Sequence, residues 1–495
     1  MLMFVLRVAA AIVFVFGTVI FVHELGHFLA AKLFGVYAPR FSIGFGPALW
    51  KRRRGETEYV IAALPLGGYV RMASREDETM ALIEGGGERP RQEAGAVGGS
   101  GAAVVPIDAD SDDVDPEAMA PFGPKPIPEH RYLESKSTAA RLIILLAGVT
   151  MNLLYGFVIT TGLFVWKGEP VIRTRVVGAV DSTAAIAGLT EKIHPGDTIF
   201  AVDGHTVSTW NDVRNRIATA SGPQVALRTS SGTATLPAGS EDDRSALSSA
   251  IAPYIAPVIS GVDRGSPAAR AGMRPGDSIV ALNGAPVDGW SDVVRRVQSA
   301  PGVPVSIRVI RDDAPVELTV RPESARVGRG EQRRVIGKIG AGADLGDDYE
   351  PVSFGQAVSL GWHGTWRLAG IIVGAVRDMV SGQGSLRDLG GPVAIADATA
   401  TAVRTGLDTV LFFTALLSVN LAIFNMLPIP ILDGGQVLIT LIEGIRGSAL
   451  SPRTREMVMR VGLVLIILLF VFVTVNDLSR LGGAIRDFFG RLFGI

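Results

Sequence analysis

The stretch LMFVLRVAAAIVFVFGTVIFVHELGHF, residues 2–28, decides the fold of this chain. Its first 21 residues are apolar apart from Arg7, and a helix of that length crosses the ~30 Å hydrocarbon layer of a membrane. The run continues without a turn signal into His23, Glu24 and His27. Ionisable side chains inside a membrane span are costly and mark functional sites. The stretch therefore predicts both a membrane protein and a site built into its first span.

Two later runs, residues 142–166 and 409–432, contain no charged residue and are also long enough to be spans. A third uncharged run, residues 461–476, is shorter, but it extends back through Val458 and Met459, with Arg460 near enough to the interface for its charge to reach water. The alternative for the first run is a cleaved signal peptide. It lacks the small-residue cleavage pattern, and the three later runs favour a span instead. We expect a polytopic α-helical membrane protein with four transmembrane helices, at residues 1–33, 137–166, 406–432 and 457–476.

The composition agrees with a membrane protein and excludes several other classes. Of the 495 residues, 48% are apolar and only 19% are charged, against ~25% charged in an ordinary soluble protein. The net charge of -1 provides no positive field for nucleic acid, so we expect no nucleic-acid partner. The absence of cysteine excludes disulfides, thiolate zinc sites and iron–sulfur clusters. Any metal must bind to His, Asp or Glu.

Basic residues follow the first and third spans, which predicts the orientation of the chain. Residues 51–54 are all basic, and four arginines lie in or just after the loop 433–456. Under the positive-inside rule, both of these segments are cytoplasmic. The segment 167–405 and the amphipathic tail 477–495 are then expected on the extracytoplasmic side.

Two segments lie between the first and second spans. Residues 34–75 form a cytoplasmic or re-entrant region in which residues 57–72 alternate around Pro65 and Gly67, a pattern typical of a β-hairpin. This membrane-associated β-hairpin is unusually apolar. Residues 76–136 are rich in Gly, Pro, Ala and acidic residues without any period, which predicts a disordered insert, with a regulatory segment as the alternative.

The segment outside the membrane contains an internal repeat. The triplet PGD at 195–197 recurs at 275–277, and Trp210 recurs as Trp290, both 80 residues later. The order AGL, PGD, DG and Trp resembles PDZ domains, which bind an extended peptide at a sheet edge. The alternative is a pair of spacers or size filters, and both Trp side chains are expected in the cores. The two tandem extracytoplasmic PDZ-like α+β domains are predicted at residues 167–255 and 256–325.

Residues 326–405 are predicted to form a linker with an interfacial helix near 354–384, where Trp362 and Trp366 lie on an apolar face. Such a helix could gate the access of substrate. A simple surface anchor is an equally good interpretation.

The motif His23-Glu24-Leu25-Gly26-His27 carries the chemistry. On a helix, residues four apart share one face, so both imidazoles can bind one metal ion. Glu24 lies beside them and can accept a proton from metal-activated water. The alternative is a chance motif on an ordinary helix. Its place at the end of an apolar span disfavours that, because uncompensated polar groups there cost free energy.

A catalytic metal site needs a third protein ligand, and Asp433 is the best candidate. Spans one and three run in the same direction, so the ends that carry His27 and Asp433 face the same side. Pro428 and Pro430 break the third helix there, and irregular backbone at membrane depth is tolerated where it lines a cavity. The alternative is that Asp433 only caps the next helix.

These residues together resemble a known family. HELGH at 23–27, NMLPIPILDGG at 425–435 and the PDZ-like copies are similar to the site-2 protease family of intramembrane zinc metalloproteases. The resemblance covers most of the chain except the insert. Three shorter runs also match the family: FSIGFGP at 41–47, PLGGYV at 65–70 and GGPVAIA at 390–396.

The resemblance implies a role for each matching residue. His23, His27 and Asp433 would hold one Zn²⁺ per chain, and Glu24 would be the catalytic general base. Asn425 would help to hold the substrate backbone. The hairpin resembles the family's re-entrant β-element, which pairs with an unwound substrate strand. The residues expected to contact substrate there are Tyr59, Val60, Ile61, Gly67, Gly68 and Tyr69.

One run departs from the family pattern. Where the family often has GPxxN at the start of the second span, this chain has GVTMN at 148–152. Because the proline is absent, a role for Asn152 in the site is left open.

By resemblance, the chain is expected to be an intramembrane metalloprotease of a bacterial inner membrane, monomeric, with its site toward the cytoplasm and its PDZ-like domains periplasmic. Besides the lipid bilayer, its partners would be single-span membrane proteins already trimmed outside the membrane, such as an anti-sigma factor or a signal-peptide remnant. Their tails could bind in the PDZ grooves. A non-catalytic PDZ scaffold with a structural metal site is the main alternative, but such a site has no use for Glu24. A metal transporter is disfavoured because no inverted repeat is seen.

Overall fold

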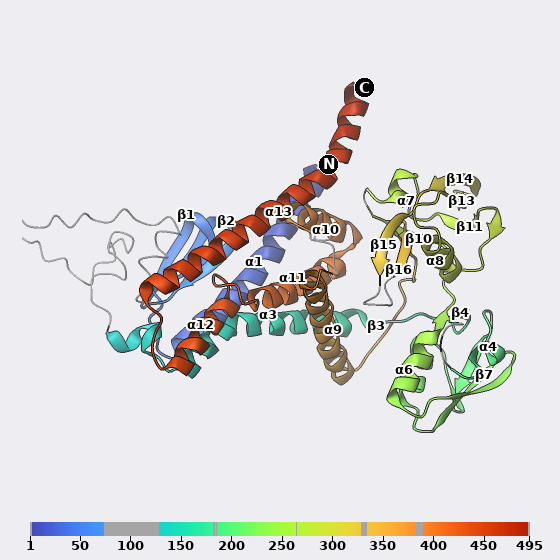
Figure 1. The fold of residues 1–495 in the computed structure, drawn as a ribbon, viewed down its shortest axis with the longest axis horizontal. Helices are drawn as coiled ribbons and strands as arrows, with labels where there is room; N and C mark the ends of the chain where they lie inside the picture. The colour runs from blue at the N-terminus through green and yellow to red at the C-terminus, as the bar shows by residue number, and fades with distance from the viewer. Residues whose placement is uncertain are drawn as a thin grey trace, which may run out of the picture. The chain divides into compact units, whose positions relative to one another are not determined.

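The structure is a computed structural model. It describes residues 2–73, 128–181, 184, 186–263, 265–327, 334–382 and 390–493, with side chains described as far as Asp477. These residues divide into two compact units, one of residues 1–164 with 354–478 and one of residues 165–353 with 479–495. Figure 1 shows the first unit as mainly long helices and the second as small sheets with short helices.

The first unit contains the four predicted spans. In the described part of the chain, four helices are long and apolar enough to cross a membrane, which confirms a polytopic membrane protein. They are α1 (Leu2–Leu33), α3 (Thr138–Lys167), α11 (Leu407–Asn425) and α13 (Pro452–Phe493). α11 ends at Asn425, earlier than the predicted 432, because the Pro428 and Pro430 segment that follows it is irregular. α13 continues as one helix through most of the predicted tail.

Three further helices pack among the spans: α9 (Phe354–Val380), α10 (Pro392–Thr405) and α12 (Asp433–Arg446). α9 places a stripe of small buried residues against α3, where an added Cβ at Gly361 would lie 2.1 Å from Thr161 Oγ1. Its other face leaves Trp362 and Trp366 half exposed. At the start of α10, the buried carboxylate of Asp477 accepts hydrogen bonds from the backbone amides of residues 393 and 394, 3.1 Å each. The last apolar span therefore caps α10.

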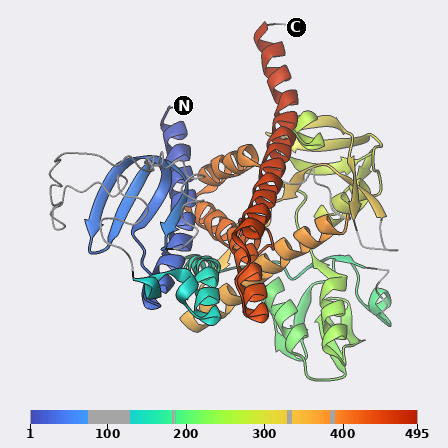
Figure 2. The same ribbon diagram turned by 60° about the vertical axis from the view of Figure 1, so that its left-hand side comes forward.

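A small sheet packs against the first helix. β1 (Arg40–Arg54) and β2 (Thr57–Arg71) pair with several register shifts, so residues 40–43 have partners at both 58–61 and 68–71. Figure 2 shows this sheet beside α1. Edge-to-face aromatic contacts join them, with the Phe41 ring centroid 5.9 Å from that of Phe21 and 5.3 Å from that of Phe28. These contacts fix the depth of the sheet along α1.

Ion pairs hold the opposite end of the sheet. Glu56 binds Lys32 at the end of α1 and Arg131, with N–O distances of 2.5 and 2.8 Å. Arg131 belongs to the first of two short 3₁₀ helices, Glu129–Arg131 and Leu133–Ser135. The prediction of disorder was therefore wrong for residues 129–135, which these contacts order, while residues 76–127 of the insert lie outside the described residues.

The second unit repeats one four-stranded antiparallel sheet. The strand order is β6-β5-β7-β8 in the first copy and β12-β11-β13-β14 in the second, and each copy has a separate apolar core. Trp210 is buried in the first core, and Trp290 packs against the second. The first copy comprises β4 (Val177–Val180), α4 (Leu189–Lys192), β5 (Ile199–Val202), β6 (His205–Thr206), α5 (Trp210–Thr219), β7 (Gln224–Thr229), β8 (Gly232–Pro237), α6 (Glu241–Ala250) and β9 (Ile251–Pro253).

The second copy and its flanking strands follow in the same order. They are β10 (Ile259–Val262), α7 (Pro267–Arg270), β11 (Ser278–Leu282), β12 (Ala285–Pro286), α8 (Trp290–Gln298), β13 (Val305–Arg311) and β14 (Ala314–Val320). The remaining strands are β3 (Glu169–Pro170), β15 (Glu323–Val327), β16 (Arg334–Lys338), β17 (Ala341–Ala343) and β18 (Tyr349–Glu350). β4 pairs with β9, and β10 pairs with β17, so each copy closes on itself.

The repeated PGD triplet has a structural role in both copies. Asp197 and Asp277 are buried, and each accepts a hydrogen bond of 2.8 Å from the backbone amide three residues earlier. In the second copy, Arg311 adds a two-pronged ion pair to Asp277, with both N–O distances at 2.7 Å. The motif therefore closes a turn rather than forming a site.

We predict that Asp277→Asn destabilises the second copy by about 2–4 kcal/mol, because Arg311 loses a buried partner. Burial alone would raise the pKa of Asp277, but the hydrogen bonds from Arg311 and from the backbone amide of Arg274, together with the charges of both arginines, outweigh it and hold this pKa below its ordinary value. The stabilisation is therefore present above about pH 4 and is lost as the pH falls through the lowered pKa. Hydrogen exchange of β11 and β13 in the full chain measures it. Glu317→Gln, which breaks the exposed pair with Arg308, is the control and should cost under about 1 kcal/mol.

Candidate metal centre

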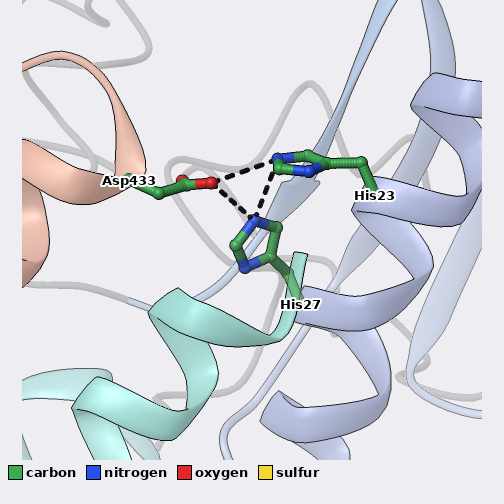
Figure 3. Close-up of side chains that lie close together, drawn as sticks. All are labelled: His23, His27 and Asp433. Atoms are coloured by element: carbon green, nitrogen blue, oxygen red, sulfur yellow. Dashed lines mark hydrogen bonds and ion pairs between the residues drawn. The ribbon is translucent and has the colours of Figure 1, made fainter. Parts of the chain in front are cut away.

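Three side chains from two distant segments meet in the first unit. His23 and His27 extend from the same face of α1, and Asp433 is the first residue of α12 (Figure 3). The Asp433 Oδ2 atom lies 3.2 Å from His23 Nε2 and 3.4 Å from His27 Nε2, and the two Nε2 atoms are 3.2 Å apart. Both imidazoles are buried. The structure brings together the three residues predicted as ligands.

The donor set fits a zinc ion. A tetrahedral ion with bonds of about 2.1 Å holds its ligand atoms about 3.4 Å apart, close to the three separations observed. Leu432, not Asp433, is at the N-cap position of α12. Among the described residues, the buried Oδ2 of Asp433 makes no well-formed hydrogen bond and lies at ion-pair distance from the two imidazole nitrogens. A buried carboxylate oxygen that faces two imidazole nitrogens is costly unless a proton or a cation lies between them. The geometry therefore favours a ligand over the alternative of a helix cap.

The second nitrogen of each imidazole also has a neighbour, and both neighbours are on α3. His27 Nδ1 lies 2.8 Å from the carbonyl oxygen of Ile144, so it carries a proton and leaves Nε2 free. His23 Nδ1 lies 3.2 Å from the side-chain amide of Asn152, which is fully buried. When Nε2 of His23 binds a metal, Nδ1 needs an acceptor, and Asn152 Oδ1 provides one if the amide is turned over.

Asn152 is thus a site residue whose role the sequence left open. Its backbone carbonyl in turn accepts a 2.8 Å hydrogen bond from Ser418 on α11. The missing proline in GVTMN does not displace Asn152 from the site. The signal that could have found it is its spacing on α3, since residues 144, 148 and 152 share one face of a helix.

Glycines allow the helices to approach the site. An added Cβ at Gly148 would lie 2.3 Å from His27 Nε2, and one at Gly26 would lie 2.4 Å from the carbonyl oxygen of Ala147. On the other side, Cβ atoms at Gly434 and Gly435 would lie 2.2 and 2.1 Å from the backbone carbonyls of residues 426 and 429. The LDGG motif therefore requires its glycines for packing of the backbone that carries Asp433.

Two further predicted residues adjoin the ligands. Asn425, the last residue of α11, places Nδ2 3.1 Å from His23 Nε2. The Glu24 carboxyl interacts with His23, His27 and Asp433 and with the backbone amide of Val70 in β2. Both residues therefore lie beside the three candidate ligands.

The sheet brings only part of the predicted substrate contacts to the site. An added Cβ at Gly68 would lie 3.2 Å from Glu24 Cγ, so β2 passes the general-base candidate there. Residues 59–61 instead pair on both sides, with 41–43 and with 50–52. Tyr59, Val60 and Ile61 therefore have no free backbone edge for a substrate strand. Among the described residues, residues 68–71 pair only with residues 40–43, so their second backbone edge has no strand partner there. Gly68 of this segment lies beside Glu24.

Gly67 and Tyr69 have internal partners in the sheet. An added Cβ at Gly67 would overlap the Phe45 ring, and its φ of +117° favours glycine. The Tyr69 ring stacks on Phe45 with 6.2 Å between centroids. These two residues shape the turn, and their side-chain positions do not contact the ligands.

A buried ion cluster, which the sequence did not indicate, anchors α12. Glu443 accepts from Arg141 Nη2 at 2.8 Å and from the backbone amide of Leu450 at 3.1 Å, and Arg455 lies 3.7 Å away. Burial alone would raise the pKa of Glu443, but these hydrogen bonds outweigh it and hold the pKa below its ordinary value. Arg141 lies on the same face of α3 as residues 144, 148 and 152. The cluster thus joins the helix behind the imidazoles to the helix that carries Asp433.

Comparison with known proteins agrees with this geometry. The model of the family "Peptidase family M50" matches residues 11–469, which is most of the chain. The chain belongs to this family, that of the site-2 proteases, and it is a zinc metalloprotease of the site-2 type.

Its relatives match over nearly their whole lengths. The chain is 32% identical to the regulator of sigma-E protease RseP of Escherichia coli, over 95% of this chain and 98% of that protein. It is 31% identical to the protease RseP of Yersinia pestis, over 97% and 100%. It is 29% identical to the zinc metalloprotease RasP of Bacillus licheniformis, over 95% and 98%. These relatives and the four apolar helices make the chain a membrane-embedded bacterial protease of regulated intramembrane proteolysis.

We predict that Gly148→Ala weakens zinc binding at least tenfold, because its methyl group would collide with the His27 ring. Zinc affinity measured with metal buffers on the purified chain tests this. Gly162→Ala, on the same helix with nothing within 4 Å of its added Cβ, is the matched control and should bind zinc like the wild type. Equal zinc affinity in all three proteins would contradict the packing role of Gly148.

We also predict that Glu443→Gln weakens zinc binding by about tenfold or more, although residue 443 is ten positions from Asp433. Arg141 would lose its buried anion, and α12 would lose its anchor. The matched control is Glu456→Gln, which removes an exposed pair with Arg460 on α13. A Glu443→Gln protein with unchanged zinc affinity would show that the cluster does not position Asp433.

Proposed function

We propose that the chain hydrolyses peptide bonds in or near the transmembrane segment of single-span membrane proteins that have already been trimmed outside the membrane. The observation that carries this proposal is the meeting of Glu24 and Asn425 with the three candidate ligands at the ends of apolar helices. A site placed there acts on a substrate that lies in the bilayer. Anti-sigma factors and signal-peptide remnants are substrates of this kind.

His23, His27 and Asp433 would hold the zinc ion, which when bound supplies activation of a water molecule and polarisation of the scissile carbonyl. Glu24 then has the general-base role. Its carboxylate takes the proton of the attacking water and passes it to the leaving amine. Glu24 lies beside residue 68 of β2, so a substrate backbone that paired with residues 68–71 would lie next to the Glu24 carboxylate.

A substrate helix hides its carbonyls in backbone hydrogen bonds, so it must unwind before cleavage. Residues 68–71 of β2 offer a strand edge beside Glu24, and an extended substrate segment added there would regain backbone partners. Asn425 would hold the substrate backbone from the opposite side of the ligands. Substrates with helix-breaking residues near the cleavage point are expected to react fastest.

The two repeated sheets of the second unit are proposed to be PDZ-like domains on the periplasmic side of the inner membrane, with the metal site toward the cytoplasm. Their equal strand order supports a duplicated binding module. They would bind trimmed substrate tails or exclude proteins with large outer domains. α9, with its exposed Trp362 and Trp366, is proposed to lie at the interface and border the substrate route, and the protein is proposed to act as a monomer.

The test is cleavage of a tagged single-span reporter, trimmed on its outer side, in the same membrane. We predict that Glu24→Gln reduces cleavage by at least about a thousandfold while zinc content stays at the wild-type value, since Glu24 is not a ligand. The control is Glu241→Gln, an exposed carboxylate of the second unit, which should cleave normally.

Two outcomes would contradict the proposal. Equal cleavage by wild type and Glu24→Gln would remove Glu24 as the base. Bound zinc without cleavage of any trimmed reporter would favour a scaffold with a structural metal site.

A further inference from the structure

The outer strand segment of the sheet is exposed along its whole length. Residues 45–54 of β1 are all exposed, and among the described residues the strand partners of residues 48–54 are residues 57–62 of β2. Leu49 is 72% exposed and Trp50 is 48% exposed. They are followed at once by Lys51, Arg52, Arg53 and Arg54, which form what we call the basic edge. A large apolar pair directly before four cations needs an environment that suits both.

The depth of each residue follows from the pairing and from α1. Phe41 contacts Phe21 and Phe28, whereas Glu56 pairs with Lys32 at the end of α1. The sheet therefore runs alongside the last 11 or so residues of that span, about 16 Å of helix. Arg54 pairs with Thr57 beside Glu56, so it lies level with the C-terminal end of α1.

Leu49 and Trp50 lie deeper than the basic edge. Trp50 pairs with Ile61, which in turn pairs with Ile43, next to the phenylalanine contacts with α1. This inference rests on the proposed function and on the expectation from the sequence that the hairpin is membrane-associated, which puts these two side chains in the acyl region. The basic edge then extends from just below the membrane–water interface toward the water. Lipid phosphates lie at this depth.

Several cations in and beside the sheet differ in their partners. Those on the side that packs on protein are neutralised, since Arg40 pairs with Glu58, and Lys32 and Arg131 pair with Glu56. None of the four residues of the basic edge makes an ion pair with another residue that the structure describes. Four adjacent cations repel one another, so an external anion would stabilise them.

We propose that the basic edge binds anionic phospholipid headgroups, with Leu49 and Trp50 in contact with the acyl chains of the same lipids. Cations and apolar residues at adjacent depths match the headgroup and the acyl chains of such a lipid. A soluble anion or an acidic protein would match only the cations. Each cation near an anionic surface adds roughly 1 kcal/mol of attraction, or about fivefold in affinity. Anionic lipid would then fix the sheet, and with it the free edge of β2, at a constant depth.

The experiment uses the full-length zinc-loaded chain in nanodiscs. The variant carries Lys51→Gln, Arg52→Gln, Arg53→Gln and Arg54→Gln together, and the readout is the phosphatidylglycerol retained against phosphatidylcholine after purification from an equal mixture. We expect the variant to lose this preference by about tenfold or more. The matched control changes four exposed arginines of the second unit to Gln, at positions 214, 228, 321 and 334, and should keep the wild-type preference.

Three further measurements separate the possible failures. Unchanged zinc content in the variant shows that it has folded. Inorganic phosphate at constant ionic strength should leave the preference intact, and its loss there would mean that a free anion rather than a lipid is bound. Quenching of Trp50 by brominated lipid, taken as the difference from Trp50→Phe, reports the depth of the sheet. A quenched Trp50 together with an unchanged lipid preference in the variant would overturn this inference, whereas an unquenched Trp50 would overturn the membrane placement itself.

Discussion

The main constraint on the first unit is the burial of two imidazoles and a carboxylate among apolar helices, which costs free energy. Such groups are tolerated only when a cation and hydrogen-bond partners compensate for lost water. The zinc chemistry of the family supplies the cation. α3 supplies the partners, the Ile144 carbonyl and the Asn152 amide, and so acts as the back wall of the site. With a bound cation and these hydrogen-bond partners, the free-energy cost of burying the three ligands is compensated.

The same requirement explains why glycines and buried ions lie where they do. Backbones must come close for three short side chains to meet, and Gly26, Gly148 and the glycines of LDGG remove the Cβ atoms that would prevent it. The arrangement must also be rigid, since a ligand displaced by one ångström no longer binds well. The buried Arg141–Glu443 pair meets that need by joining α3 to α12. The glycines set how closely the helices approach one another, and the Arg141–Glu443 ion pair aligns α12 with α3.

The sequence predicted the parts of the structure that local patterns encode. Uninterrupted apolar runs gave the four spans, and the HExxH spacing gave two ligands on one helical face. Asp433 was found because Pro428 and Pro430 mark a break beside it. Long-range partners carry no such pattern. Nothing local in Asn152, Glu443 or Asp477 shows which helix will lie opposite, and the alternation of residues 57–72 could not show that 59–61 would be enclosed between two neighbours.

The spans differ greatly in length, and this ties the enzyme to bilayer thickness. α11 has 19 residues, about 28 Å, whereas α3 has 30 residues, about 45 Å. A flat hydrocarbon layer of about 30 Å matches α11, so α3 either tilts or extends past that layer. Because α11 ends at Asn425, beside His23, the metal site lies at the end of the shortest span that the structure describes. Any change in bilayer thickness that moves the end of α11 therefore moves a residue of the metal site with it.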